Sequence, residues 1–194
     1  KLNSLDVDMI LIAGDLTYYP DEWDLKELFA PLKELQHPTY WVLWNHDVEQ
    51  PGPPLRTELI EALDYPQIHH INNQVVELDG FTLVWLWSHW NREDDVALLE
   101  QYTAEDNIIV LAHNPDTISK YSNASADITL VGHTHGGQIR IPWLYKHVIP
   151  TRWNFDRWLT YELNGLLYIT VWVWETALPM RFLNPPTIDV LHMQ

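Results

Sequence analysis

The sequence predicts an α/β fold in which two packed β-sheets carry helices on their outer faces. Strand and helix patterns alternate over the first two thirds of the chain, whereas the last third is almost entirely β, and this order is typical of layered α/β proteins. The chain has 194 residues, of which 46% are hydrophobic and 20% charged. We therefore expect a single globular domain over residues 1–194.

The individual elements follow from apolar patterns and turn residues. Continuous apolar runs predict buried, parallel strands over 8–15, 40–43, 107–112 and 127–131. Apolar residues at helical spacing predict an amphipathic helix over 21–35, and shorter helices are expected over 55–63, 94–102 and 117–121. Asp79-Gly80 and Asn164-Gly165 predict β-hairpins over 74–86 and 159–173, and further short strands are expected over 138–141, 181–183 and 187–191.

Charge and cysteine content exclude several classes of function. The chain has 11 Lys and Arg against 27 Asp and Glu, a formal charge of −16, which disfavours nonspecific binding to nucleic acid or anionic lipid. We therefore expect no nucleic-acid partner. The absence of cysteine excludes disulfides, thiolate zinc sites and cysteine nucleophiles. No apolar run reaches the roughly 18 residues of a membrane span, and a cytoplasmic or membrane-associated location is expected.

Side chains that bind metals or carry protons follow four of the predicted strands. They are Asp15, Asn45 with His46 and Asp47, His113, and His133 with His135. Because the carboxyl ends of parallel strands share one edge of a sheet, we expect these side chains to converge. A mixed set of carboxylate, amide and imidazole ligands without sulfur suits Zn, Mn or Fe.

Each of these signals also has a purely structural explanation when taken alone. A strand that ends in Gly-Asp is common, Asn-His-Asp can be turn chemistry, and His113 can be a hydrogen-bonded core histidine. The segment Gly132-His-Thr-His-Gly-Gly137 is more specific, because flanking glycines let the backbone pass close by while two imidazoles face one cavity.

Four motifs resemble, in order and spacing, those of the calcineurin-like metallophosphoesterase superfamily. They are Gly14-Asp15, Asn45-His46-Asp47, Ala112-His113 and Gly132-His133-Thr134-His135. The extension to Gln138 and the ending 180–186 resemble its small bacterial phosphodiesterase branch. The resemblance implies a four-layer αββα sandwich with two mixed sheets and a site for two divalent metal ions.

The resemblance also implies the role of each residue. Asp15 would bridge the two metal ions, Asn45, His113 and His133 would complete one site, and His135 would bind the other ion. His46, oriented by Asp47, would be the acid–base or charge-stabilising residue beside the phosphate.

The implied reaction is hydrolysis of a phosphodiester or pyrophosphate bond by a metal-bound hydroxide. The expected substrate is a phosphorylated small molecule or a lipid-linked compound. The alternative is a catalytically silent protein of the same fold that serves as a binding scaffold.

One motif of the superfamily has no counterpart in this sequence. The superfamily begins with Asp-x-His on its first strand, which supplies two ligands to the ion that His135 would bind. We therefore expect that the chain lacks its first strand and any N-terminal membrane anchor, and that a metal titration shows one tight site.

Tryptophan is unusually frequent, with 11 residues against only 7 glycines. Eight tryptophans stand where turn chemistry or the family pattern predicts glycine: Trp44, Trp85, Trp87, Trp143, Trp153, Trp158, Trp172 and Trp174. One interpretation is a systematic replacement of glycine by tryptophan in this sequence; the other is an aromatic substrate cleft. An indole is disfavoured wherever the backbone requires a positive φ.

Overall fold

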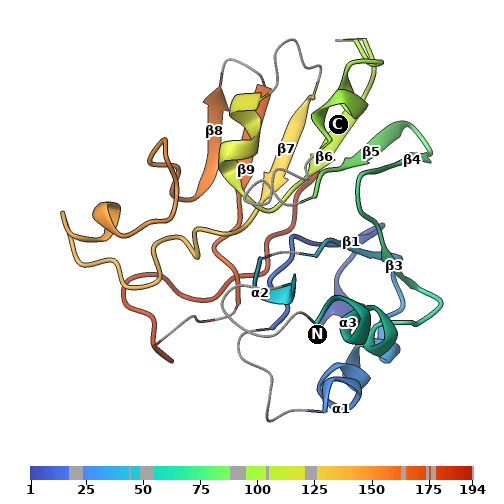
Figure 1. Cartoon of the computed structure of the whole chain (residues 1–194), viewed down its shortest axis with the longest axis horizontal. Helices are drawn as coiled ribbons and strands as arrows, with labels where there is room; N and C mark the ends of the chain where they lie inside the picture. The colour runs from blue at the N-terminus through green and yellow to red at the C-terminus, as the bar shows by residue number, and fades with distance from the viewer. Residues whose placement is uncertain are drawn as a thin grey trace. The chain divides into compact units, whose positions relative to one another are not determined.

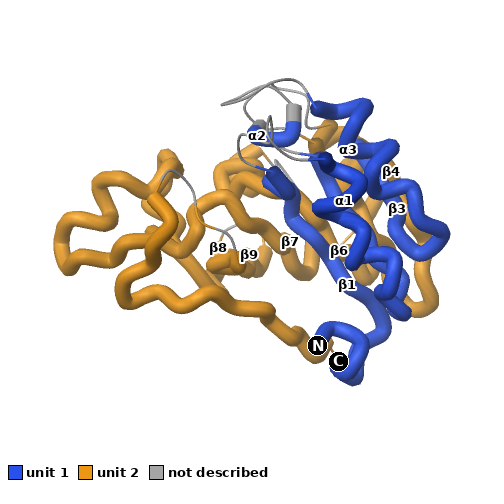
Figure 2. Tube along the Cα trace, turned by 90° about the horizontal axis from the view of Figure 1, so that it is seen from below, with its two compact units in different colours: residues 1–72 blue, residues 73–194 orange. Residues whose placement is uncertain are grey.

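The structure is a computed structural model that describes residues 1–17, 24–43, 45–48, 55–87, 95–103, 105–120, 126–162, 165–173, 175 and 178–193. The chain forms two compact units, residues 1–72 and 73–194 (Figure 2). Among the helices in the described ranges, none has both the length and the apolar character that a membrane span requires.

The first unit is built on a parallel sheet of three strands in the order β1-β2-β3. These strands are β1 (Ile10–Ile12), β2 (Thr39–Trp41) and β3 (Ile68–His70). Its helices are η1 (Leu2–Ser4), α1 (Leu25–Phe29), η2 (Ala30–Glu34), α2 (Asn45–Val48) and α3 (Arg56–Ala62). Helices α1 and α3 pack against each other. Leu43 and Leu59 are fully buried in this unit.

The long helix expected over 21–35 is broken in the structure. It begins at α1, where the Asp24 carboxylate accepts a hydrogen bond from the Lys26 backbone N–H at 2.9 Å, and it changes into the 3-10 helix η2. Pro31 lies in the first turn of η2 and has no backbone N–H to continue the α-helical ladder. The prediction of a continuous amphipathic helix was therefore wrong, and residues 21–23 lie outside the described residues.

The second unit contains a mixed sheet of six strands in the order β4-β5-β6-β7-β9-β8 (Figure 1). Its strands are β4 (Gln74–Leu78), β5 (Phe81–Trp85), β6 (Ile108–Leu111), β7 (Ile128–Val131), β8 (Trp158–Glu162) and β9 (Gly165–Ile169). Both predicted hairpins are present as the antiparallel pairs β4–β5 and β8–β9. The 3-10 helices are η3 (Val96–Leu99), η4 (Pro115–Lys120) and η5 (Tyr145–His147).

Strands β6 and β7 are parallel neighbours at the centre of this sheet. Every residue of β6 is buried, as expected for a continuous apolar run between two parallel partners. Ile108 and Val110 belong to a core cluster that also includes Leu167 and Ile169 of β9. This buried centre fixes the carboxyl ends of β6 and β7, where His113 and His133 follow.

The end of the chain contains less regular structure than the sequence predicts. In place of strands over 138–141 and 181–183 there is one isolated parallel bridge between Ile139 and Phe182, and residues 187–191 form no strand. Isolated stretches of this kind lack the neighbouring strands that would extend their hydrogen bonding. The two sheets and their helices nevertheless confirm the predicted α/β class.

Three of the eight unusual tryptophans have the backbone conformation of glycine. Trp143, Trp158 and Trp172 have φ values of 67°, 65° and 65°. A side chain in this left-handed region costs roughly 1–2 kcal/mol relative to glycine. Trp85, by contrast, is a fully buried residue of β5, inside the strand that the sequence predicts, and its backbone does not require glycine. Trp44 and Trp174 lie outside the described residues.

Candidate metal centre

Asp15 follows β1 in the first unit and is buried. Its φ of 52° turns the chain sharply just after the strand, a conformation that Asp tolerates better than most residues. One carboxylate oxygen accepts a hydrogen bond of 3.4 Å from the His46 backbone N–H, and the other lies 4.0 Å from His46 Nε2. The ends of the parallel neighbours β1 and β2 therefore bring Asp15 and His46 together, as the sequence predicts.

Asp47 is fully buried and connects the same two loops. Its carboxylate accepts hydrogen bonds from the backbone N–H and the hydroxyl of Thr17, at 3.2 and 3.4 Å. Asp47 thereby fixes the loop that carries Asp15. Asn45 is the first residue of α2, and the structure describes its backbone.

Burial raises the pKa of the Asp15 carboxyl from 3.8 to about 7, although the charge of His46 and the hydrogen bond from its backbone act in the opposite direction. The physical cause is desolvation, which disfavours the charged form of a carboxyl group. A divalent cation beside this oxygen would compensate the buried charge. The chemistry of Asp15 therefore fits a metal ligand.

We predict that the metal-free protein loses stability as the pH rises from about 4 to about 7. In this range the folded protein retains a proton on Asp15 that the unfolded chain has released, so a rise in pH favours unfolding. The decrease in the free energy of unfolding is at most about 4 kcal/mol, which is the free-energy equivalent of the pKa shift of Asp15. Urea unfolding of chelator-treated protein at several pH values measures it.

The Asp15→Asn variant should show a flatter pH dependence because it has no carboxyl group to ionise. Asp64→Asn is the control, since Asp64 is an exposed carboxylate of the same unit. Equal pH dependence in wild type and Asp15→Asn would contradict the assignment of the raised pKa to Asp15.

His113 and His133 meet at the ends of β6 and β7 in the second unit. His113 is fully buried, His133 nearly so, and His113 Nε2 lies 3.1 Å from His133 Nδ1. Two imidazole nitrogens bound to one metal ion at about 2.1 Å, at a right angle, are about 3 Å apart. The two rings are hydrogen-bonded to each other, and their nitrogens are close enough together to bind one cation.

A backbone carbonyl determines which nitrogen of His133 is available. His133 Nε2 lies 2.9 Å from the carbonyl oxygen of Pro150. Since a carbonyl only accepts, Nε2 carries the proton, and a neutral His133 presents a lone pair at Nδ1 toward His113. Hydrogen bonds of this kind orient metal-binding histidines and increase their basicity.

The Pro150 carbonyl is itself held in place by Asp116. Both oxygens of the buried Asp116 carboxylate accept from the Arg152 backbone N–H, at 3.2 and 3.0 Å. The Asp116 backbone N–H in turn donates to the side chain of Asn114 at 2.8 Å. Segment 150–152 is thus fixed to the residues that follow His113.

His135 is held by the final segment of the chain. Its φ of 50° and the glycines that follow turn the loop sharply after β7. The buried side chain of Asn184 donates to the His135 carbonyl oxygen at 2.6 Å and accepts from Arg157 at 3.2 Å. A Cβ on Gly136 would lie 2.9 Å from Asn184 Oδ1, so only glycine fits this approach.

The indole of Trp172 packs against two of the three histidines. Its ring centroid lies 5.1 Å from that of His113 and 5.2 Å from that of His135, in edge-on arrangements. We call residues 132–137 the histidine loop. A Cβ on Gly132 would meet the indole nitrogen of Trp172, so the indole covers the backbone at the start of this loop. Trp172 therefore occupies space directly beside His113 and His135.

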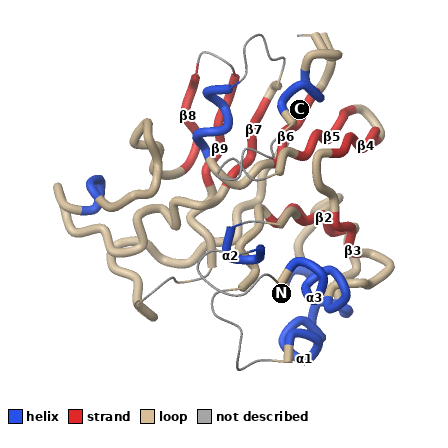
Figure 3. The backbone as a smooth tube through the Cα atoms, in the orientation of Figure 1, coloured by secondary structure: helices blue, strands red, loops and turns tan. Residues whose placement is uncertain are grey.

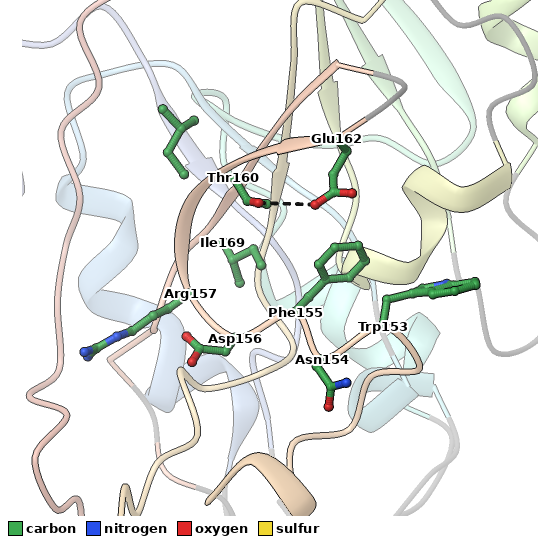
Figure 4. Close-up of a pocket in the computed structure, with 9 residues that line it drawn as sticks. Trp153, Asn154, Phe155, Asp156, Arg157, Thr160, Glu162 and Ile169 are labelled. Carbon is green, nitrogen blue, oxygen red and sulfur yellow. Dashed lines mark hydrogen bonds between the residues drawn. The ribbon is translucent and has the colours of Figure 1, made fainter. Parts of the chain in front are cut away.

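A cavity of about 360 Å³ lies close to this loop (Figure 4). Phe155, Ile169 and the hydrogen-bonded pair Thr160 and Glu162, at 3.2 Å, are among its lining residues. Asp156 also lines it, and the Asp156 carbonyl accepts from the hydroxyl of Thr134 at 2.6 Å. The cavity is thereby connected to the residue between His133 and His135.

Sequence reasoning identified the histidines but missed the residues that hold them. Pro150 and Asp116 carried no signal, because one acts through its backbone and the other through a contact distant in sequence. Asn184 belongs to the ending 180–186, whose resemblance to a phosphodiesterase branch was the available signal.

The chain is similar to a known protein family and to several curated proteins. A family model described as calcineurin-like phosphoesterase matches residues 1–137. An uncharacterized metallophosphoesterase of Helicobacter pylori strain 26695 is 28% identical over 100% of this chain and 53% of its own length.

Two further relatives have names that state an activity. The phosphodiesterase YaeI of Escherichia coli K12 is 31% identical over 70% of this chain and 51% of its own length. The UDP-2,3-diacylglucosamine pyrophosphatase LpxG of Chlamydia trachomatis is 49% identical over 56% of this chain and 31% of its own length. The chain spans about half the length of the first curated relatives it matches.

Proposed function

Since the chain belongs to the calcineurin-like phosphoesterase family, we propose that it hydrolyses a phosphodiester or pyrophosphate bond with the help of two divalent cations. The observation that carries this proposal is the pair of ring nitrogens of His113 and His133, 3.1 Å apart, with the proton of His133 fixed on the opposite side by Pro150. This arrangement supports the proposal because it holds two buried imidazole nitrogens close enough together to bind one cation.

In the proposed centre, both units act as one metallophosphoesterase domain. Asp15, Asn45, His113 and His133 would hold one cation, and Asp15 and His135 would take part in holding the other. Divalent cations in such a centre activate water and neutralise charge on the phosphoryl oxygens. The metal identity proposed from the donor set is Mn, Zn or Fe.

The protein's own residues position the reacting groups. His46, whose ring nitrogen is 4.0 Å from the Asp15 carboxylate, exchanges a proton with the substrate or stabilises charge beside the phosphate. Asp47 holds the Asp15 loop through its hydrogen bond to Thr17, and its second proposed role is to orient His46. The cavity beside Thr134 accepts the part of the substrate beyond the phosphate.

The proposed substrate is a phosphorylated small molecule or a lipid-linked compound. Support comes from relatives named phosphodiesterase and UDP-2,3-diacylglucosamine pyrophosphatase. The cavity combines aromatic and aliphatic side chains with two carboxylates and a guanidinium, a lining that suits a ring carrying hydroxyl groups.

We expect bis-p-nitrophenyl phosphate to be hydrolysed in the presence of Mn²⁺, with activity lost on chelation and restored by added metal. The physical reason is that the protein contributes ligands and orientation, whereas the cations supply the positive charge that this acidic chain lacks. Release of p-nitrophenol is followed with each of Mn²⁺, Zn²⁺ and Fe²⁺, and the monoester p-nitrophenyl phosphate is the comparison substrate.

One observation favours the alternative of a catalytically silent scaffold: the Trp172 indole occupies space beside His113 and His135. If no metal supports turnover by the protein or by its Trp172→Gly variant, the scaffold is the better description.

A further inference from the structure

An exposed apolar surface lies close to the histidine loop in the second unit. We call it the Leu144 surface and define it by seven side chains that are each 46–69% exposed: Ile141, Leu144, Val148, Leu178, Met180, Phe182 and Leu183. The definition leaves out Trp143, whose backbone conformation is of the glycine type. Soluble proteins rarely expose so many neighbouring apolar side chains unless the surface binds something.

The two segments that carry these side chains are neighbours in the structure. Ile139 and Phe182 form a parallel bridge, in which the Arg140 N–H donates to the Phe182 carbonyl at 2.9 Å and the Phe182 N–H to the Gln138 carbonyl at 3.1 Å. The Gln138 side chain also donates to the Leu178 carbonyl at 2.8 Å. Segments 138–148 and 178–183 are therefore fixed side by side.

The sequence around segment 138–148 is basic, whereas the chain as a whole is acidic. None of the 27 acidic residues lies between Asp127 and Asp156, although the chain has a net charge of −16. The same stretch contains Lys146 and Arg152, both exposed. Electrostatic attraction at a charged surface acts over about 8 Å at physiological salt, so local charge matters more here than the total.

The Leu144 surface is held rigidly to the histidine loop. Arg140 donates to the Gly136 carbonyl at 2.6 Å and to the Tyr145 hydroxyl at 2.8 Å, and its guanidinium lies 3.9 Å from the centre of the Tyr145 ring. Asp156 accepts from both Arg140 and Tyr145, at 3.2 and 3.0 Å. The segment is loop apart from η5 (Figure 3), and these bonds give it a defined shape.

We propose that the Leu144 surface docks on the headgroup region of an anionic lipid bilayer. Apolar side chains flanked by exposed cations match the two layers of that region, the acyl boundary and the lipid phosphates. A second copy of the chain is a poorer match, because a two-fold interface would bring the cations of both copies together. Docking brings the histidine loop to the membrane surface. This step rests on the proposed function: an enzyme held at the membrane selects phosphoesters that are carried by lipids.

The test is co-sedimentation with vesicles of phosphatidylcholine alone and of phosphatidylcholine mixed with phosphatidylglycerol. Wild type is expected to bind the mixed vesicles more strongly, and Ile141→Asp/Leu144→Asp is expected to weaken this binding by on the order of tenfold or more. Lys146→Gln should weaken binding to the mixed vesicles only. Tyr161→Asp is the matched control, because Tyr161 is an exposed residue of β8 outside the surface.

Thermal unfolding of each variant verifies that it is folded. Equal vesicle binding by wild type and the double variant would overturn the proposal. So would a wild-type dimer in size-exclusion chromatography that the double variant abolishes, which would identify self-association. Hydrolysis of the soluble diester is measured on the same samples, so that loss of docking and failure of the proposed function are told apart.

Discussion

The His133→Ala variant is expected to lose phosphodiester hydrolysis by about a thousandfold or more, because metal ligands supply several kcal/mol of stabilisation to the charged transition state. His133 is nearly buried, its Nδ1 lies 3.1 Å from His113, and its other nitrogen is bonded to Pro150. Steady-state kinetics with bis-p-nitrophenyl phosphate and Mn²⁺ measure the loss.

A second measurement separates loss of the metal from loss of the fold. A ligand that binds only the folded state raises its stability, so Mn²⁺ should increase the melting temperature of wild type but not that of His133→Ala. His192→Ala is the control, since His192 is an exposed histidine of the same unit. Retention of both activity and the Mn²⁺-dependent stabilisation in His133→Ala would refute its role as a ligand.

The Trp172→Gly variant is expected to increase kcat/KM for the soluble diester by about tenfold or more and to tighten Mn²⁺ binding. The indole packs edge-on with its centroid 5.1 and 5.2 Å from those of His113 and His135, so its removal opens space beside both rings. A tenfold effect corresponds to about 1.4 kcal/mol, which is a modest share of the free energy that the contacts of a buried indole contribute. Kinetics and calorimetric titration with Mn²⁺ measure both changes.

Trp143→Gly is the matched control, because Trp143 has nearly the same φ, 67° against 65°, but is 90% exposed. It should relieve a similar backbone cost of roughly 1–2 kcal/mol and raise the melting temperature by a few degrees. It should leave metal affinity and kcat/KM unchanged. If both glycine variants change the kinetics equally, the indole of Trp172 does not lie in the path of substrate or metal.

The strands and hairpins could be predicted because their signals are local. The apolar run before His113 has neighbouring strands on both sides, and Asp79-Gly80 and Asn164-Gly165 predict hairpins between strands that are adjacent in sequence. The helix over 21–35 was overestimated because its apolar spacing continues through Pro31, where the backbone hydrogen bonding changes. Strand β3 was not predicted, because the polar pair His69-His70 does not continue the apolar pattern of a buried strand. The structure nevertheless pairs β3 with β2 in parallel.

The order of donors along the chain and the chemistry they share were determined by the sequence alone, since strand ends and glycine-flanked histidines are local features. Only the tertiary structure decided which nitrogen of His133 faces His113, because the Pro150 carbonyl and the Asp116 that fixes it are distant in sequence. It alone also placed Trp172 against the histidines and joined segments 138–148 and 178–183 into one apolar surface. The physical reason is that hydrogen-bond direction and side-chain packing depend on the folded path of the chain, which no local pattern of residues contains.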